Sequence, residues 1–220
     1  MNEEIFIKKK DRYKLDSLKS YNKYQKKYDD IFWMKVFSVN KWDESVLEEV
    51  QNDIAELHIL DIGCATGRLL ERLAMAGARF LYGTDIAANM MKVVKMRLMD
   101  YDAKLELKAA DVETKLPWDN EKFDVITITG AFHHFYNPND ALHEIFRVLR
   151  KDGRLIVLEP RFIIVYRQLL NLYLRIFMHD GDYKFYSPKS LAKLVCNSGF
   201  ILKERDVRVG WLGYKAIFKK

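Results

Sequence analysis

The chain has 220 residues, 49% hydrophobic and 31% charged, a composition that favours one globular domain and excludes a disordered or fibrous protein. Its 37 basic and 31 acidic residues give a net charge of +6, which favours anionic partners but is too small to indicate a nucleic-acid-binding protein. The two cysteines, Cys64 and Cys196, lie far apart in a chain too large to need disulfides, and they predict reduced thiols in an intracellular protein.

The N-terminal residues MNEEIFIKKK lack the apolar run of a signal peptide. The most apolar stretch, 162–178, is interrupted by polar and charged residues, whereas a spanning helix needs about 20 apolar residues. We therefore expect a cytoplasmic protein without a membrane-spanning helix.

Residues 1–56 predict a helical cap that precedes the sheet. Tyr21, Tyr24 and Tyr28 recur there at helical spacing, which indicates either a packed face or a lid that closes over a ligand.

From residue 57 onward, short apolar runs alternate with longer helical segments. The runs that predict strands are LHILDI, ARFLYGTD, AKLELKAAD, FDVITIT and RLIVLEP. A helix in RLLERLAMAG is expected to stop at Gly77, and another in NPNDALHEIFRVLRKDG is expected to be capped by Asn137 and to end at Gly153. Strands separated by helices predict parallel βαβ units in a core at 57–160.

Three features complete the predicted domain. Residues 161–186 are expected to form an inserted helix that covers the substrate side. Residues 187–220 are expected to begin with a helix that is capped by Ser187 and stopped by Gly199. The last two runs, joined across Gly210, predict a β-hairpin. The expected fold class is α/β, doubly wound, with a mostly parallel seven-stranded sheet, a terminal antiparallel strand and helices on both faces.

The segment ILDIGCATGRLLERL predicts a ligand site at the end of the first strand. Gly63 and Gly67 allow a tight turn in which backbone approaches a ligand closely. A dinucleotide-binding fingerprint fails because Ala65 and Arg68 stand where glycine and a small residue are needed, and a phosphate-binding loop fails because lysine is absent. Since Asp61 would repel pyrophosphate, a cationic or zwitterionic ligand is better matched.

Three successive predicted strands each end in an aspartate, at Asp61, Asp85 and Asp111. Asp85 lies 24 residues beyond Asp61, close to the distance of roughly 20 at which an acidic residue meets a ribose in such folds. Three carboxylates around one switch point predict a ligand with hydroxyls, an amine and a positive group. The competing interpretations are a cap at Asp61, a solvated Asp85 and a plain turn at Asp111, with Cys64 as a small filler rather than a nucleophile.

In combination, LDIGCATG, YGTDIA, ADVETKLPW, FDVITITGAFHHF and LHEIFRVLRKDGRLIVLEP resemble the motifs of class I S-adenosylmethionine-dependent methyltransferases. The resemblance runs over 57–159 and is greatest to the type 11 group, which includes quinone-biosynthesis and other small-molecule methyltransferases. It implies a Rossmann-like sheet, S-adenosyl-L-methionine as cofactor, S-adenosyl-L-homocysteine as product and no metal.

The resemblance also assigns a cofactor site. Asp61 is implied near the methionine ammonium, Asp85 on the ribose hydroxyls and Asp111 at the adenine amine. The implied cofactor-binding residues are Asp61, Gly63, Cys64, Ala65, Gly67, Asp85, Ile86, Met90, Asp111, Val112 and Thr129. The chain departs from the family at Ala65, where glycine is usual.

Side chains just beyond the fourth strand are placed to act on a methyl acceptor. We expect His134 to face the substrate as a general base and His133 to pack or hydrogen-bond locally, the alternative being that both are structural. Further candidate substrate contacts are Glu159, His179, Tyr183 and Tyr186.

The stretch 161–178 is apolar around most of a helical circumference, with a narrow polar stripe. It predicts a helix that packs on the core, pairs with a second subunit, or offers a hydrophobic wall to substrate. Residues 161–220 hold 12 basic and 4 acidic residues, which favours an anionic or amphipathic acceptor or a membrane-surface encounter there. Arg161, Arg167 and Arg175 are the candidate contacts.

The predicted function is direct in-line methyl transfer from S-adenosylmethionine to a small acceptor. A nucleobase acceptor is disfavoured because no Asn/Asp-Pro-Pro-Tyr/Phe motif follows the fourth strand. Two rival functions stay open: an RNA- or ribosome-directed methyltransferase, and a noncatalytic cofactor-binding regulator.

Overall fold

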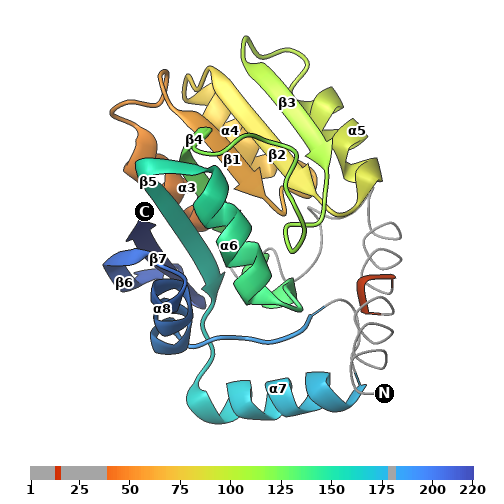
Figure 1. Ribbon diagram of the computed structural model, residues 1–220, viewed down its shortest axis with the longest axis vertical. Helices are drawn as coiled ribbons and strands as arrows, with labels where there is room; N and C mark the ends of the chain where they lie inside the picture. The colour runs from red at the N-terminus through yellow and green to blue at the C-terminus, as the bar shows by residue number, and fades with distance from the viewer. Residues whose placement is uncertain (1–12, 16–38, 178–181) are drawn as a thin grey trace.

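The computed structural model describes residues 13–15, 39–177 and 182–220, which build one α/β sheet with helices on both faces (Figure 1). The strands are β1 (His58–Ile62), β2 (Phe80–Asp85), β3 (Lys104–Ala109), β4 (Phe123–Thr129), β5 (Leu149–Pro160), β6 (Ile201–Val209) and β7 (Gly213–Lys219). The helices are α3 (Val39–Val50), α4 (Arg68–Met75), α5 (Ala88–Arg97), the short 3₁₀ helix η2 (Phe132–His134), α6 (Pro138–Val148), α7 (Ile164–Phe177) and α8 (Pro188–Asn197).

The sheet order is β3-β2-β1-β4-β5-β7-β6. The first five strands pair in parallel, and β7 pairs antiparallel with both β5 and β6. The sequence-based fold class is therefore confirmed, including the antiparallel strand near one edge. Because β1 and β4 neighbour each other while the chain winds outward on both sides, the switch point lies at the carboxyl ends of β1 and β4.

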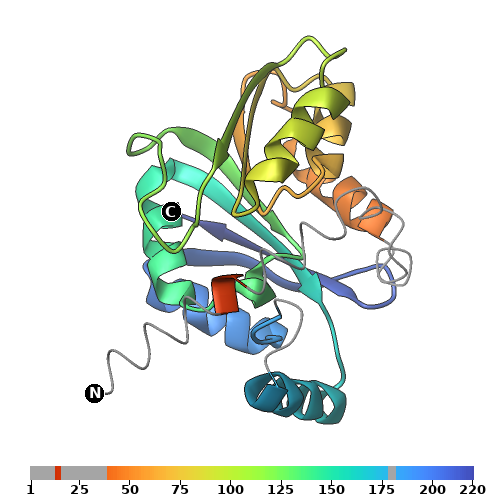
Figure 2. The ribbon, with the colours of Figure 1, turned by 90° about the vertical axis from the view of Figure 1, so that its right-hand side faces the viewer.

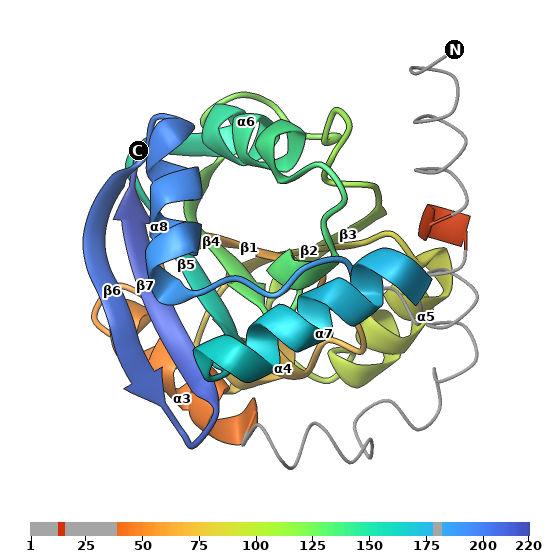
Figure 3. The same ribbon diagram turned by 90° about the horizontal axis from the view of Figure 1, so that it is seen from below.

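Helices cover both faces of the sheet (Figure 3), and a cluster of buried apolar residues lies on each face. Alternate residues of each strand face opposite sides, so Ile59 packs with α3, α4 and α5, whereas Leu60 packs with α6 and α8. The helix α7 lies apart from both layers, beyond the carboxyl ends of the parallel strands (Figures 1 and 2).

Several local expectations are confirmed. Ser187 caps α8 by accepting a hydrogen bond from the backbone N–H of Ser190 at 3.1 Å. Gly77 and Gly199 follow α4 and α8 with φ of 98° and 97°, the left-handed conformation expected after a helix end. The terminal hairpin turns at Gly210.

Two expectations around α6 were wrong. Asn137 occupies the N-cap position but makes no capping bond, because its side-chain amide donates to Asp140 Oδ2 at 2.5 Å. The helix ends at Val148 rather than Gly153, since the fully buried Leu149 is extended and already belongs to β5. Burial of Leu149 in the sheet outweighs the helical preference of the residues after it.

The described part of the chain contains no helix that is long and apolar enough to cross a membrane. The tyrosine repeat of Tyr21, Tyr24 and Tyr28, and His179, lie outside the described residues.

Candidate active site

Asp61 and Asp85 end adjacent strands, and Asp111 follows the next strand, β3. The parallel register aligns Asp61 with Gly83 of β2, and Asp85 with Ala109 of β3. The three carboxylates therefore lie at the carboxyl-terminal ends of neighbouring parallel strands, as their positions in the sequence predict.

The turn after β1 has the backbone conformation that a close approach of ligand requires. Gly63, Ala65 and Gly67 have positive φ values of 73°, 45° and 80°. A Cβ atom at Gly63 would lie 2.5 Å from the Cβ of Ala131, so a side chain is excluded there. Ala65 tolerates the left-handed conformation at a cost of about 1 kcal/mol, so the departure from glycine preserves the turn.

Asp85 ties this turn to the start of α5. Its Oδ2 accepts from the backbone N–H of Ala65 at 3.0 Å, and its Oδ1 accepts from Ala87 at 2.9 Å. Ile86 beside it is half-buried, and Met90 in the first turn of α5 is buried. A ligand bound by Asp85 would thus contact both the glycine turn and α5.

Asp61 is the most deeply buried of the three aspartates, with 3% of its surface exposed. The hydroxyl of Thr127 donates to its Oδ1 at 2.7 Å. Burial raises the pKa of Asp61 to about 7, the nearby charge of Asp85 adds to this, and the Thr127 hydrogen bond opposes it. A cationic group bound beside Asp61 would stabilise its ionised form.

Asp111 has a double role. Its Oδ1 accepts from the backbone N–H of Glu113 at 3.0 Å, which forms the local turn that the sequence left as an alternative. Its other carboxylate oxygen forms an ion pair with Lys14. Val112, between Asp111 and Glu113 in the sequence, is buried in the core.

Cys64 and Thr129 complete the predicted cofactor set. Cys64 is buried, and its Sγ would lie 3.1 Å from a Cβ atom placed at Gly83, so the thiol fills space beside a glycine. Burial, with the charges of Asp61 and Asp85, raises its pKa well above the ordinary value, which disfavours a thiolate. The hydroxyl of Thr129, at the end of β4, is buried without a hydrogen-bond partner among the described residues.

The donor set fits S-adenosylmethionine on these observations. Buried carboxylates suit its ammonium and hydroxyl groups, the positive-φ turn leaves backbone accessible, and the Thr129 hydroxyl offers a polar contact. The residues that would hold it are those of the turn together with Asp61, Asp85 and Asp111.

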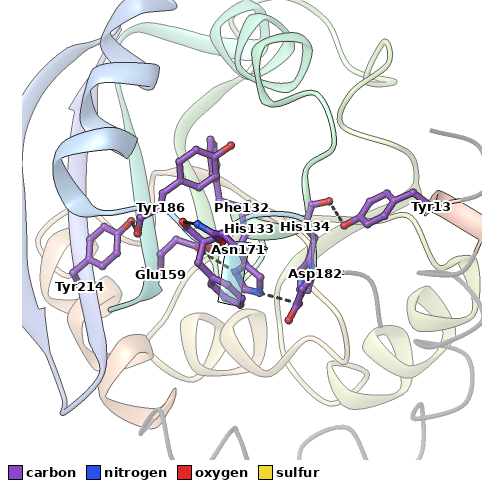
Figure 4. Close-up of polar contacts among 10 residues, drawn as sticks. Tyr13, Phe132, His133, His134, Glu159, Asn171, Asp182, Tyr186 and Tyr214 are labelled. Atoms are coloured by element: carbon purple, nitrogen blue, oxygen red, sulfur yellow. Dashed lines mark hydrogen bonds and ion pairs between the residues drawn. The ribbon is translucent and has the colours of Figure 1, made fainter. Parts of the chain in front are cut away.

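Beyond β4, four side chains form a second polar cluster (Figure 4). Glu159 accepts from the backbone N–H of Phe132 at 2.9 Å and contacts His133 Nδ1 at 2.8 Å. On the other side, Asp182 Oδ1 lies 3.5 Å from His133 Nε2 and 3.2 Å from His134 Nδ1. His133 is thus held between two carboxylates, whereas Asp182 bridges both histidines.

The pKa of His133 is set by burial and by its two carboxylate neighbours. Burial lowers the pKa of His133, but the carboxylates of Glu159 and Asp182 outweigh it and raise the pKa to about 10. Burial favours the neutral form of Asp182, yet its hydrogen bond to His133 and the charges of both histidines lower its pKa. His133 is therefore an imidazolium that neutralises part of the carboxylate charge.

Ring nitrogens of His133 and His134 and a carboxylate oxygen of Asp182 lie within 4.8 Å of one another, a spacing that a metal ion could bridge. The same residues form ion pairs with one another, which account for the cluster without a metal. The expectation of a metal-free reaction stays a prediction.

The segment 182–187 lies directly against the histidines. Backbone N–H groups of Tyr183 and Lys184 donate to His133 O at 2.9 and 3.0 Å. The Tyr183 ring packs against Tyr136 at 4.8 Å between centroids, whereas Tyr186 is buried against Phe132 in the core. Of the predicted substrate residues, Tyr183 is half-buried, and both Tyr186 and Glu159 are buried.

Asp182 and Asn171 were missed by sequence reasoning. Asp182 precedes Tyr183 in the segment already singled out, and its acidic character was the available signal. Asn171 belongs to the narrow polar stripe predicted for 161–178, for which no contact was predicted. In the structure it accepts from Phe185 N at 2.8 Å and donates to Phe185 O at 2.9 Å. Both residues act through contacts between distant segments.

A family profile described as a methyltransferase domain, of type 11, matches residues 60–157. A demethylmenaquinone methyltransferase from Leptospira interrogans is 29% identical over 145 residues, which cover 64% of this chain and 58% of that protein. A ubiquinone/menaquinone biosynthesis C-methyltransferase from Chromobacterium violaceum is 34% identical over 146 residues, covering 63% and 54%. The chain therefore spans less than two thirds of the length of these relatives.

A solved S-adenosylmethionine-dependent methyltransferase from Aquifex aeolicus superposes with a TM-score of 0.67 and 20% identity, over 89% of this chain and 96% of that one. At that identity the likeness shows the shared fold. Over residues 60–157 the chain matches a type 11 methyltransferase domain, and its strand order and glycine turn agree with the class I S-adenosylmethionine-dependent methyltransferase fold.

Proposed function

We propose that this protein transfers the methyl group of S-adenosylmethionine to a small, quinone-like acceptor. One observation carries the proposal. The glycine turn with its aspartates follows β1, and the His134–Asp182 contact lies just beyond β4, the strand beside β1. The sulfonium cofactor supplies an already activated methyl group, so the protein has to align the partners, exclude water and remove a proton.

The cofactor half of the site has distinct roles for its carboxylates. Asp61 would meet the ammonium from a buried position, and Asp85 would accept hydrogen bonds from the ribose hydroxyls while it also accepts from the backbone N–H groups that hold the turn. Asp111 meets the adenine amine. Because three carboxylates converge at this edge, the site favours a cation with hydroxyl groups over a phosphate.

His134 is the proposed general base, with Asp182 as its orienting carboxylate. A neutral His134 whose Nδ1–H points toward Asp182 Oδ1, 3.2 Å away, would carry its basic lone pair on Nε2. His133 cannot share this role because its raised pKa keeps it protonated. Glu159 and His133 therefore position the loop that carries His134, through bonds to Phe132 N and to Asp182.

The acceptor class rests on two supports. The relatives are named for demethylmenaquinone and for ubiquinone and menaquinone biosynthesis, whose molecules carry an aromatic ring on an apolar chain. The helix α7, beside the loop of Asp182, exposes a row of large apolar side chains. An amphipathic ring acceptor fits both observations, and a cytoplasmic location accessible to such molecules remains part of the proposal.

The test begins with calorimetry using S-adenosylmethionine, followed by release of S-adenosylhomocysteine with a short-chain demethylated quinol. We expect binding, and product release that depends on the quinol. Binding without release from any acceptor would favour the noncatalytic regulator. Release only with RNA, with affinity that falls steeply as salt rises, would favour the RNA-directed enzyme.

A further inference from the structure

The helix α7 carries its apolar face on the outside of the molecule. Six apolar residues of α7 form one helical stripe. Four of them follow one another at intervals of four, three and four residues, and the other two each adjoin one of these four. Its members are Val165, Tyr166, Leu169, Leu172, Tyr173 and Ile176, which are 61%, 50%, 61%, 53%, 48% and 62% exposed. Such a stripe normally faces a core, so its outward position is informative.

The orientation of α7 is fixed by contacts on its opposite side. Asn171 makes two hydrogen bonds to the backbone of Phe185, at 2.8 and 2.9 Å, and Leu174 is buried. Rotating the helix to bury the stripe would break both hydrogen bonds and expose Leu174. The outward stripe is therefore the arrangement that this packing selects.

Exposed apolar side chains are also found on the approach to α7 and on the terminal hairpin. The backbone N–H of Arg161 donates to Leu212 O at 2.7 Å, which places the approach to α7 beside the β6–β7 turn. Ile163 on that approach is 78% exposed, and Trp211 in the turn is 88% exposed. Tryptophan is the residue that most favours the boundary between water and lipid.

The helix α7 and its approach carry charge of one sign. Residues 161–177 contain Arg161, Arg167 and Arg175 and no acidic residue. Arg161 forms an ion pair with Asp206, and Arg175 is exposed. An apolar stripe on a helix without acidic residues, in a segment 161–220 that holds 12 basic and 4 acidic residues, complements an anionic lipid surface.

We propose that α7 and Trp211 dock this protein on the surface of an anionic phospholipid bilayer. With 14 residues, α7 is about 21 Å long, too short to span a hydrocarbon core of about 30 Å, so it lies in the interface plane. A second copy of the chain fits this surface less well, because pairing two α7 helices would bring together arginines without an acidic residue on either helix. Resting on the proposed function, docking also presents a lipid-borne acceptor beside Asp182.

The test is co-sedimentation of the full chain with vesicles of phosphatidylcholine alone or with phosphatidylglycerol. The variant carries Leu169→Glu and Leu172→Glu, both on the exposed stripe. The matched control carries Met96→Glu and Met99→Glu, which are each 72% exposed in the cofactor half of the chain. Sedimentation velocity of each protein without lipid reports self-association.

We expect the wild type and the methionine variant to sediment with anionic vesicles and the leucine variant to lose about tenfold or more of its partitioning. Salt should weaken binding of the wild type. Absence of vesicle binding, equal binding by the leucine variant, or a dimer that this variant abolishes would each overturn the proposal. Turnover of a water-soluble quinol by the wild type without vesicles tests the methyltransferase proposal separately from the docking proposal.

Discussion

Asp61 links the stability of the fold to its ligand site. Its pKa is about 7 in the folded protein against an ordinary value of 3.8, so the folded state holds the proton more strongly. The folded protein therefore loses stability as pH rises from about 4 to 7, by at most about 4 kcal/mol.

The variant Asp61→Asn removes this ionisation while keeping an oxygen that accepts from Thr127. We expect its free energy of unfolding, measured by denaturant titration without ligand, to exceed that of the wild type at pH 8 and to approach it near pH 4. A variant less stable than the wild type at pH 8 would contradict this assignment.

The same carboxyl predicts how cofactor affinity depends on pH. Because a bound ammonium favours ionised Asp61, binding below pH 7 must displace a proton. The calorimetric Kd for S-adenosylmethionine should therefore rise about tenfold between pH 8 and pH 6. In Asp61→Asn the affinity should be weaker and nearly independent of pH, and a wild type with a flat profile would contradict the ammonium contact.

His134 and Asp182 are expected to act as one unit in proton removal. Either His134→Ala or Asp182→Asn should lower kcat by about 100-fold while leaving the Kd for cofactor unchanged, because their 3.2 Å contact orients the base. The double variant should lose little more than either single variant. Multiplicative losses, measured as initial rates of S-adenosylhomocysteine release, would show that the residues act independently.

At the scale of elements, Asn171 couples α7 to the catalytic loop. The variant Asn171→Ala removes both hydrogen bonds to Phe185, so hydrogen exchange in 182–187 should accelerate by an amount equivalent to about 1–3 kcal/mol. Because Asp182 begins this segment, kcat should fall as well.

The control Gln168→Ala changes an exposed residue of the same helix. It should alter neither exchange nor kcat. Equal acceleration in both variants, or none in Asn171→Ala, would contradict the role of the two Asn171 hydrogen bonds.

Predictability also differed between elements. The strands and most helix ends follow local rules, since apolar runs mark β1 and β4 and the cap at Ser187 needs only residues three apart. The end of α6 did not follow them, because burial of Leu149 in β5 depends on the whole sheet. The aspartate-lined edge was predictable because each strand end is visible in the sequence, whereas the partnership of Asp182 with His134 joins residues 48 positions apart.

At the scale of the whole molecule, charge is segregated from the cofactor site. The excess of basic residues falls within 161–220, on the segment that carries α7 and the terminal hairpin. On the proposed function, this segment lies on the acceptor side of the site.

Neutralising Arg161, Arg167 and Arg175 together to glutamine should raise the KM for an anionic or amphipathic acceptor several-fold and spare the Kd for cofactor. The control replaces the exposed Lys92, Lys95 and Lys151 of the cofactor half with glutamine. A lower cofactor affinity with an unchanged acceptor KM in the arginine variant would refute this division of the surface.

The most direct measurement of the central claim is the rate of S-adenosylhomocysteine formation from S-adenosylmethionine and a short-chain demethylated quinol, for the wild type and Asp85→Ala. The proposal predicts that the wild type forms methylated quinol in an amount equal to S-adenosylhomocysteine and that the variant loses most of this activity, since Asp85 holds the turn and is the proposed ribose contact. Equal rates in the two proteins, or a wild type that binds no cofactor at millimolar concentration, would contradict the account.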